Sequence, residues 1–235
     1  MKSIKFITTT ILIASLFMSC ASKQDYEDEA PYFEEEEDES ALSDHYLSTE
    51  MTDDFLGDFS PIELDEKVAL VKQMNKLAPK ELNNIYLNPR DNTVEITFRY
   101  GVNLTTVIFN KAERDKIKEA AEKFLADYDA KLLQRHKVNS KTAYFKSKCP
   151  LYWGVLSDSN VAYKNDYYVN YEYFNKRMYF LFHFSPSATK KGNDVYSAKT
   201  VIYFSPTQLR DFLEIMDQDY LNAQVKNLRT KAYTY

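Results

Sequence analysis

The distribution of charge along the chain limits which part of it can fold. Residues 21–66 carry 18 acidic side chains and one basic side chain, a net charge of −17. Like charges at this density repel one another and resist collapse, and Glu34–Glu39 is the densest block. We therefore expect residues 20–59 to form a disordered acidic tether, and residues 60–235 to form one globular domain.

The rest of the chain has the opposite charge. Residues 67–235 carry 27 Lys and Arg against 17 Asp and Glu, a net charge of +10. Two interpretations remain open: the tether is a solvated spacer beside a mildly basic domain, or it folds back over a basic face. The second requires close contact, because charges are screened beyond about 8 Å at physiological salt.

The first 19 residues have the pattern of a secretory signal peptide. Lys2 and Lys5 precede an apolar run, Phe6 to Met18, which is shorter than the roughly 20 residues that span a bilayer. The run ends in the sequence Leu16-Phe17-Met18-Ser19-Cys20, which resembles the lipobox of bacterial lipoproteins. Phe17 replaces the usual aliphatic residue, as in the looser lipobox of spirochaete and Bacteroidetes lipoproteins.

The resemblance implies that Cys20 is lipidated and anchors the protein to a membrane of the bacterial cell envelope. Each buried CH₂ group contributes about 0.8 kcal/mol, so several acyl chains hold the protein firmly. The alternatives are an ordinary cleaved signal peptide in which Cys20 stands by chance, and an uncleaved anchor helix. With Cys20 lipidated, Cys149 has no intramolecular partner, and we expect it to be a small buried hydrophobic residue.

Three segments combine a helix N-terminal signal with apolar residues at helical spacing. Ser60-Pro61-Ile62-Glu63 and Ser205-Pro206-Thr207-Gln208 have the capping-box pattern with proline at the first helical position. Asn110 opens a looser version of the same signal. We expect helices from Ser60 to near Pro79, from Asn110 to near Leu132, and from Ser205 to near Tyr220.

Between these segments the apolar period falls to two, which is typical of strands. We expect one hairpin from strands 94–100 and 103–109, a second from strands 167–174 and 177–184, and a last strand at 196–204. The fold class predicted from this order is α+β, an antiparallel sheet with about three helices packed on one face. The similar strand-to-helix junctions at Asn110 and Ser205 suggest two related β–β–α units, or two junctions that obey the same capping physics.

The sequence contains no motif for metal, cofactor or phosphate binding. Its three histidines, His45, His136 and His183, are scattered, and neither H-x-x-x-H nor C-x-x-C occurs. We therefore expect no metal and no cofactor. Cys149 and His183 could meet across the sheet as a thiolate–imidazole pair. A structural cysteine and a sheet histidine explain both residues without catalysis.

The tyrosines form the most unusual pattern, because 13 of the 19 follow residue 140. Tyrosine suits half-buried strands, but it also supplies large rigid area and a hydroxyl group at contact surfaces. In strand 167–174 alternate residues share a face, so Tyr168 and Phe174 lie opposite the other tyrosines. The sequence predicts a partner-binding surface formed by Tyr163, Tyr167, Tyr171 and Tyr173.

These patterns lead to one functional hypothesis and one alternative. The hypothesis is a lipid-anchored envelope protein that acts as a non-catalytic binding or assembly module for an envelope protein or glycan. An exported protein rarely meets nucleic acid, so we expect no nucleic-acid partner. The alternative is an envelope hydrolase whose active site the sequence conceals.

Overall fold

The computed structural model describes residues 55–82, 84–155, 160–189 and 195–232, all within the unit Thr49–Tyr235. The expected signal peptide 1–19, the expected lipidation site Cys20 and the expected tether as far as residue 54 lie outside the described residues.

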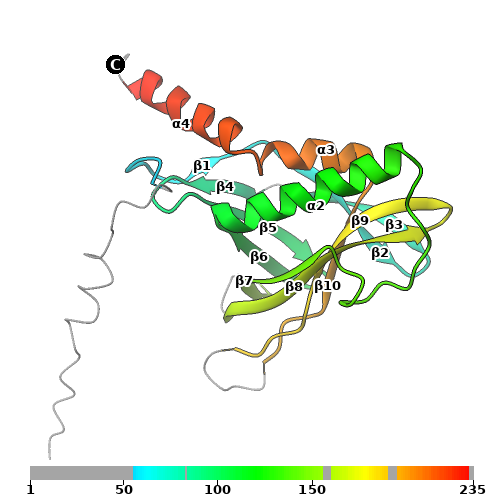
Figure 1. Cartoon of the computed structure of the whole chain (residues 1–235). Coiled ribbons are helices and arrows are strands. Elements are labelled where there is room, and N and C mark those ends of the chain that lie inside the picture. Colours follow the sequence, from blue (N-terminus) through cyan, green and yellow to red (C-terminus); the bar gives the residue numbers. More distant parts are fainter. Residues whose placement is uncertain (1–54, 83, 156–159, 190–194, 233–235) are drawn as a thin grey trace, which may run out of the picture. The chain divides into compact units, whose positions relative to one another are not determined.

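Ten antiparallel strands form one sheet in the described part of the chain, in the order β1-β4-β5-β6-β7-β8-β9-β10-β2-β3 (Figure 1). The strands are β1 (Ile62–Glu63), β2 (Lys67–Gln73), β3 (Lys76–Leu82), β4 (Asn84–Asn88), β5 (Thr93–Tyr100), β6 (Asn103–Phe109), β7 (Phe145–Gly154), β8 (Asn160–Phe174), β9 (Arg177–Phe184) and β10 (Thr200–Phe204). The N-terminal strands are divided between the two ends of the sheet. β1 pairs with β4 at one end, and the β2–β3 hairpin pairs with β10 at the other.

The sheet curls, because β3 at the end of the strand order approaches β5. Its inner face is filled by large aromatic side chains, which include Phe98, Phe109, Phe182, Phe184 and Phe204. The space left among them is about 10 Å³, which is at the lower limit for holding one water molecule. The interior of the curled sheet is therefore a packed core.

The described helices are α2 (Lys111–Asp129), α3 (Pro206–Glu214) and α4 (Gln218–Ala232). Helices α2 and α3 contact each other and lie against the inner face of the sheet (Figure 1). The stripe that α2 buries contains Ile117, Ala120, Ala121 and Phe124. Helix α4 follows a bend after α3 and buries Leu221 and Val225 in the same core.

The predicted α+β class, with about three helices packed on one face of a sheet, is wrong. Strands dominate the described residues, and the sheet curls around its core instead of carrying a layer of helices. Each of α2 and α3 follows an antiparallel strand pair, β5–β6 and β9–β10, and both pairs belong to one continuous sheet. The two junctions share local capping geometry, because Asn110 and Ser205 each accept a hydrogen bond from a backbone N–H three residues ahead.

The helix predicted from Ser60 to Pro79 is also wrong, because this segment forms β1, β2 and β3. Burial alternates along β2, where Lys67, Ala69 and Val71 face inward. Because the first inward position of β2 is a lysine, the apolar residues of this segment do not show the period of two that is typical of a strand.

Other local predictions are confirmed. The two hairpins appear as β5–β6 and β8–β9, and helices begin after Asn110 and Ser205. Gly101 turns the first hairpin with a left-handed φ of 61°. Asn175 and Lys176 turn the second with φ values of 47° and 65°, the geometry of a tight two-residue turn. The last strand is shorter than predicted, and the third helix ends at Glu214 before α4 begins.

Candidate functional site

Two of the predicted partner-binding tyrosines lie on the inner face of β8. Tyr167 is 2% exposed, and its hydroxyl group donates a hydrogen bond to the carboxylate of Glu113. The ring of Tyr171 packs against Phe124, and its hydroxyl group donates to the backbone oxygen of Gln134 at 2.9 Å. Tyr167 therefore belongs to the core, and Tyr171 lies at its margin.

The other two predicted tyrosines lie apart from this pair. Tyr163 is 54% exposed and stands where the register between β7 and β8 shifts. Tyr173 is half-buried at the end of β8, with the guanidinium of Arg135 3.9 Å from its ring centre. The four tyrosines thus do not form one continuous surface.

An open groove of about 440 Å³ lies along β7 and β8 and is lined by residues of both faces, including Lys146 and Tyr168 on the outer side and Ser147 and Tyr167 on the inner side. We call it the β7–β8 groove; it is lined by Val138, Asn139, Ser140, Lys146, Ser147, Asp166, Tyr167, Tyr168 and Ser185. Strand pairing places Lys146 beside Tyr168. The ring of Tyr168 stacks on His183 of β9 at a centroid distance of 4.3 Å. An aromatic side chain therefore lines the groove together with amine, amide, hydroxyl and carboxylate groups.

One wall of the groove is the loop between α2 and β7, and the buried side chain of Asn170 holds it in place. The amide nitrogen of Asn170 donates to the backbone oxygen of Asn139 at 3.2 Å and to the hydroxyl group of Thr142 at 3.0 Å. Its amide oxygen lies 3.1 Å from Nε2 of His136. The backbone N–H of Tyr144 donates to the oxygen of Val169 at 2.9 Å. This wall is fixed by hydrogen bonds within the protein.

The same stretch is strongly basic. Residues 130–148 contain six Lys and Arg side chains and no Asp or Glu, namely Lys131, Arg135, Lys137, Lys141, Lys146 and Lys148. All six are exposed. The carboxylate of the groove, Asp166, lies 3.4 Å from the amine of Lys148, and both side chains are mostly solvated. An exposed pair of this kind contributes at most about 1 kcal/mol.

Glu113 of α2 lies at the groove's inner side and is nearly buried. Its carboxylate accepts hydrogen bonds from Tyr167, from the hydroxyl group of Ser147 at 2.9 Å and from the amine of Lys116 at 2.8 Å. Burial alone would raise the pKa of Glu113, but these donors outweigh it and lower the pKa. Burial and the neighbouring carboxylate raise the pKa of Tyr167. Glu113 therefore stays charged and Tyr167 stays protonated at neutral pH.

The Cys149–His183 pair considered from the sequence does not form. Cys149 lies in the inner core, whereas His183 stacks on Tyr168 on the outer face of the sheet. Cys149 is 1% exposed, which confirms the expected buried residue, and burial raises the pKa of its thiol. Burial and the nearby Lys199 lower the pKa of His183.

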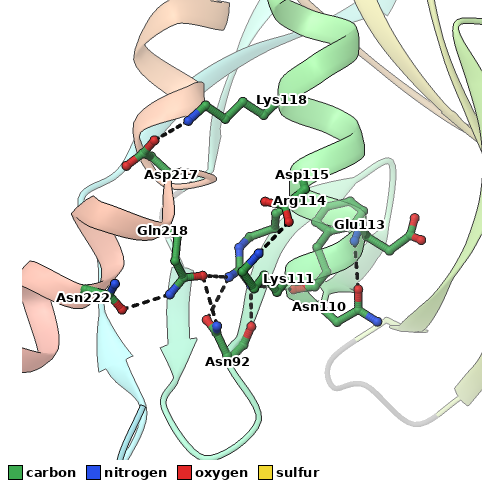
Figure 2. A network of polar contacts seen from close by, with 11 residues as sticks. Asn92, Asn110, Lys111, Glu113, Arg114, Asp115, Lys118, Asp217, Gln218 and Asn222 are labelled. Atoms are coloured by element: carbon green, nitrogen blue, oxygen red, sulfur yellow. Dashed lines mark hydrogen bonds and ion pairs between the residues drawn. The ribbon is translucent and has the colours of Figure 1, made fainter. Parts of the chain in front are cut away.

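A second polar network ties α2 to α4 and to the β4–β5 turn (Figure 2). The fully buried Arg114 donates from Nη2 to the side chains of Asn92 and Gln218, both at 2.8 Å. It also donates from Nη1 to the backbone oxygens of Asn92 and Phe109. These contacts satisfy backbone and amide oxygens inside the fold, so we assign Arg114 a structural role.

Sequence reasoning missed Asn170, Lys146 and the loop wall of the groove. One signal was available, the basic stretch without acids at 130–148. Among the described residues no group of three His, Cys, Asp or Glu side chains could hold a metal ion. No helix in the described ranges is both long and apolar enough to cross a membrane.

Comparison with known proteins places the chain in a family. Residues 38–223 match the family described as "Uncharacterised Treponema protein". The chain belongs to this family. A protein of Treponema pallidum (strain Nichols), described as "Uncharacterized protein", is 28% identical over 195 residues, which cover 80% of this chain and 68% of that protein. Treponema are spirochaetes, so the match agrees with the spirochaete-like form of the signal sequence, while lipidation of Cys20 stays a prediction.

Proposed function

We propose that this chain is a lipid-anchored protein of the bacterial cell envelope whose domain is a non-catalytic binding or assembly module. It engages an envelope protein or glycan at the β7–β8 groove. The observation that carries this proposal is the groove itself: a concave surface that combines an aromatic side chain with hydrogen-bonding groups of several kinds.

The rigidity of the groove supports a binding role. The buried Asn170 bonds to the loop wall through both ends of its amide, so the wall is ordered before any partner arrives. A preformed site avoids part of the entropy cost of ordering loops on binding. Tyr163 and the Arg135–Tyr173 pair offer further aromatic contacts outside the groove.

The titratable groups beside the groove favour binding over acid–base chemistry. A general acid or base works best with a pKa near the working pH. The pKa of Glu113 is lowered and the pKa values of Tyr167 and Cys149 are raised, so all three move away from neutrality. The hydrogen bonds that Glu113 accepts from Ser147 and Tyr167 hold α2 against β7 and β8.

The membrane part of the proposal rests on the lipobox resemblance at Cys20. Cells expressing the chain in a bacterial host with lipoprotein processing should incorporate labelled fatty acid into the wild-type protein. The Cys20→Ser variant should lose this label. Equal labelling of the two proteins would contradict an anchor at Cys20.

The groove is tested by site-specific photocrosslinking in cells. A photoreactive amino acid is placed at Ser140 in the groove wall, at the exposed Tyr163, and at the control position Val102, which is 70% exposed at the β5–β6 turn. We expect discrete adducts from Ser140 and Tyr163 and none from Val102. Adducts of equal pattern at all three positions, or none at Ser140, would overturn the proposal.

A further inference from the structure

We propose that the β7–β8 groove binds an acidic oligosaccharide, a chain of sugar rings that carry carboxylate groups. This inference rests on the proposed binding function and specifies the chemistry of its partner. It follows from three properties of the groove: its charge, its donor and acceptor groups, and its size.

The charge around the groove selects an anionic partner. The loop wall and the start of β7 belong to the stretch 130–148, which carries six exposed cations and no acid. Lys146 lies in the groove, and Lys137 and Lys141 flank the lining residues Val138, Asn139 and Ser140. A cluster of one sign attracts oppositely charged ligands and speeds their association, an effect that falls as salt concentration rises.

The hydrogen-bonding groups select a sugar over a plain polyanion. The hydroxyl groups of Ser140 and Ser185 can each donate and accept hydrogen bonds, whereas the carboxylate of Asp166 can only accept. A carboxylate in the groove repels an anion that carries no donors. Sugar hydroxyl groups are donors, so an acidic sugar satisfies Asp166 with its hydroxyls and Lys146 with its carboxylate.

The shape of the groove fits a short oligosaccharide. Its volume of about 440 Å³ falls within the roughly 300–1,000 Å³ of small-ligand sites. Tyr168 and Val138 give it apolar surface, on which the C–H face of a sugar ring can pack. A peptide that binds by strand addition instead needs a free sheet edge, and β8 is paired on both sides, with β7 and β9.

The test is titration calorimetry of the full chain with three probes. The first is trigalacturonate, which carries both hydroxyl groups and carboxylates. The second is its methyl ester, which keeps the rings and removes the charge, and the third is hexaglutamate, which keeps the charge and lacks the rings. We expect saturable binding of trigalacturonate with a Kd below about 1 mM, and at least tenfold weaker binding of the other two.

Three variants locate the binding and identify its chemistry. Lys146→Gln should weaken binding of trigalacturonate about tenfold, and Lys226→Gln, which makes the same charge change on α4, should leave it unchanged. Asp166→Ala decides between sugar and polyanion by the direction of its effect. This variant should bind trigalacturonate several-fold more weakly, because a hydrogen-bond acceptor is lost. It should bind hexaglutamate more tightly, because the repulsion between two carboxylates is removed. Unchanged melting temperatures show that the variants remain folded.

Three results would overturn the inference. If hexaglutamate binds more tightly than trigalacturonate, the partner is an acidic protein segment and the groove still acts as a binding site. If no probe binds at millimolar concentration, or if Lys226→Gln weakens binding as much as Lys146→Gln, the acidic-sugar assignment fails. The crosslinking experiment at Ser140 then decides separately whether the groove binds any partner.

Discussion

Two stretches of this chain begin with the same kind of tetrapeptide and adopt different structures. Ser205-Pro206-Thr207-Gln208 starts helix α3 and closes a capping box, with reciprocal hydrogen bonds between Ser205 and Gln208. Ser60-Pro61-Ile62-Glu63 leads instead into β1, where Ile62 and Glu63 pair with residues of β4. A capping signal therefore permits a helix but does not decide that one forms.

The residues that follow each tetrapeptide decide the outcome. After Ser205, the side chains of Leu209, Phe212 and Met216 are buried at helical spacing. After Ser60, inward side chains alternate along β2, and Val68, which a helix would bury, is 41% exposed. Tertiary burial of one face overrides the local signal at the start of the segment.

One ion-pair cluster links the two stretches. The side chain of Lys67 in β2 is 4% exposed, and its amine lies 3.2 Å from Asp211 and 2.7 Å from Glu214, both in α3. Removing either stretch would leave the other with an unmatched charge.

The first prediction tests the burial that fixes α3. Phe212 is 2% exposed, and its ring centre lies 4.6 Å from that of Phe204. Phe212→Ala should lower the free energy of unfolding by about 4 kcal/mol, because it empties a packed site. Ile62→Ala in the two-residue strand β1 should cost about 2 kcal/mol, since an edge can relax more readily. Urea denaturation measures both, and equal losses would show that the two stretches are anchored alike.

The second prediction concerns the link between the stretches. Lys67→Ala should cost about 2 kcal/mol, because it empties the space filled by a buried side chain as well as removing the partner of two half-exposed carboxylates. Lys67→Met, which fills the same space without charge, should stay within about 1 kcal/mol of wild type. If methionine is as damaging as alanine, the ion pairs rather than the packing hold β2 on α3.

The pH dependence of stability sharpens this prediction. Burial alone would lower the pKa of Lys67, but Glu214 and Asp211 raise it above its ordinary value of 10.5. Because the folded pKa is the higher one, the stabilisation is complete below the unfolded pKa and is lost as pH rises through the folded pKa. The stability difference between wild type and Lys67→Met should therefore shift against wild type as the pH rises above 10.5, and should stay constant below it. A difference that stays constant above pH 10.5 as well would contradict the ion pairs.

The third prediction separates the two capping signals directly. Ser205→Ala should cost about 1 kcal/mol, because the side chain that accepts the Gln208 N–H is lost. Ser60→Ala should change stability by less than about 0.5 kcal/mol, since Ser60 is exposed and precedes a strand. A loss of 1 kcal/mol at Ser60 would mean that this serine caps a helix in solution.

The fourth prediction tests the strand assignment of β2 with one change of small expected effect and a matched change at a buried position. Val68→Lys should alter stability by less than about 0.5 kcal/mol, because Val68 faces solvent opposite Glu81 of β3. The matched change Ala69→Lys places a charge at a fully buried position and should unfold the domain. A similar loss at both positions would argue against the strand.

The sequence predicted the parts of the fold that local patterns determine. The β5–β6 and β8–β9 hairpins carry alternation and turn residues, and Asn110 and Ser205 mark helix starts that the structure confirms. The prediction failed at β2, because Lys67 occupies an inward position that an apolar residue usually fills. The fold class failed for a related reason, because the pairing of β2 with β10 depends on contacts between residues far apart in sequence.

The candidate site was located only in part from the sequence. The tyrosine cluster drew attention to β8, but the bulge between β7 and β8 and the cover provided by α2 decide which rings are exposed. Asn170 could not be recognised as the residue that fixes the groove wall. Its partners lie on a loop some 30 residues earlier, and only the folded chain brings them together.

The pairing of β2 with β10 also sets when this domain can finish folding. The β2–β3 hairpin is made early in synthesis, but its sheet partner includes Ile202 and Tyr203, near the C-terminal end. An isolated two-stranded hairpin is only marginally stable in water, so the first strands must wait for the last. Long-range pairing of this kind slows folding.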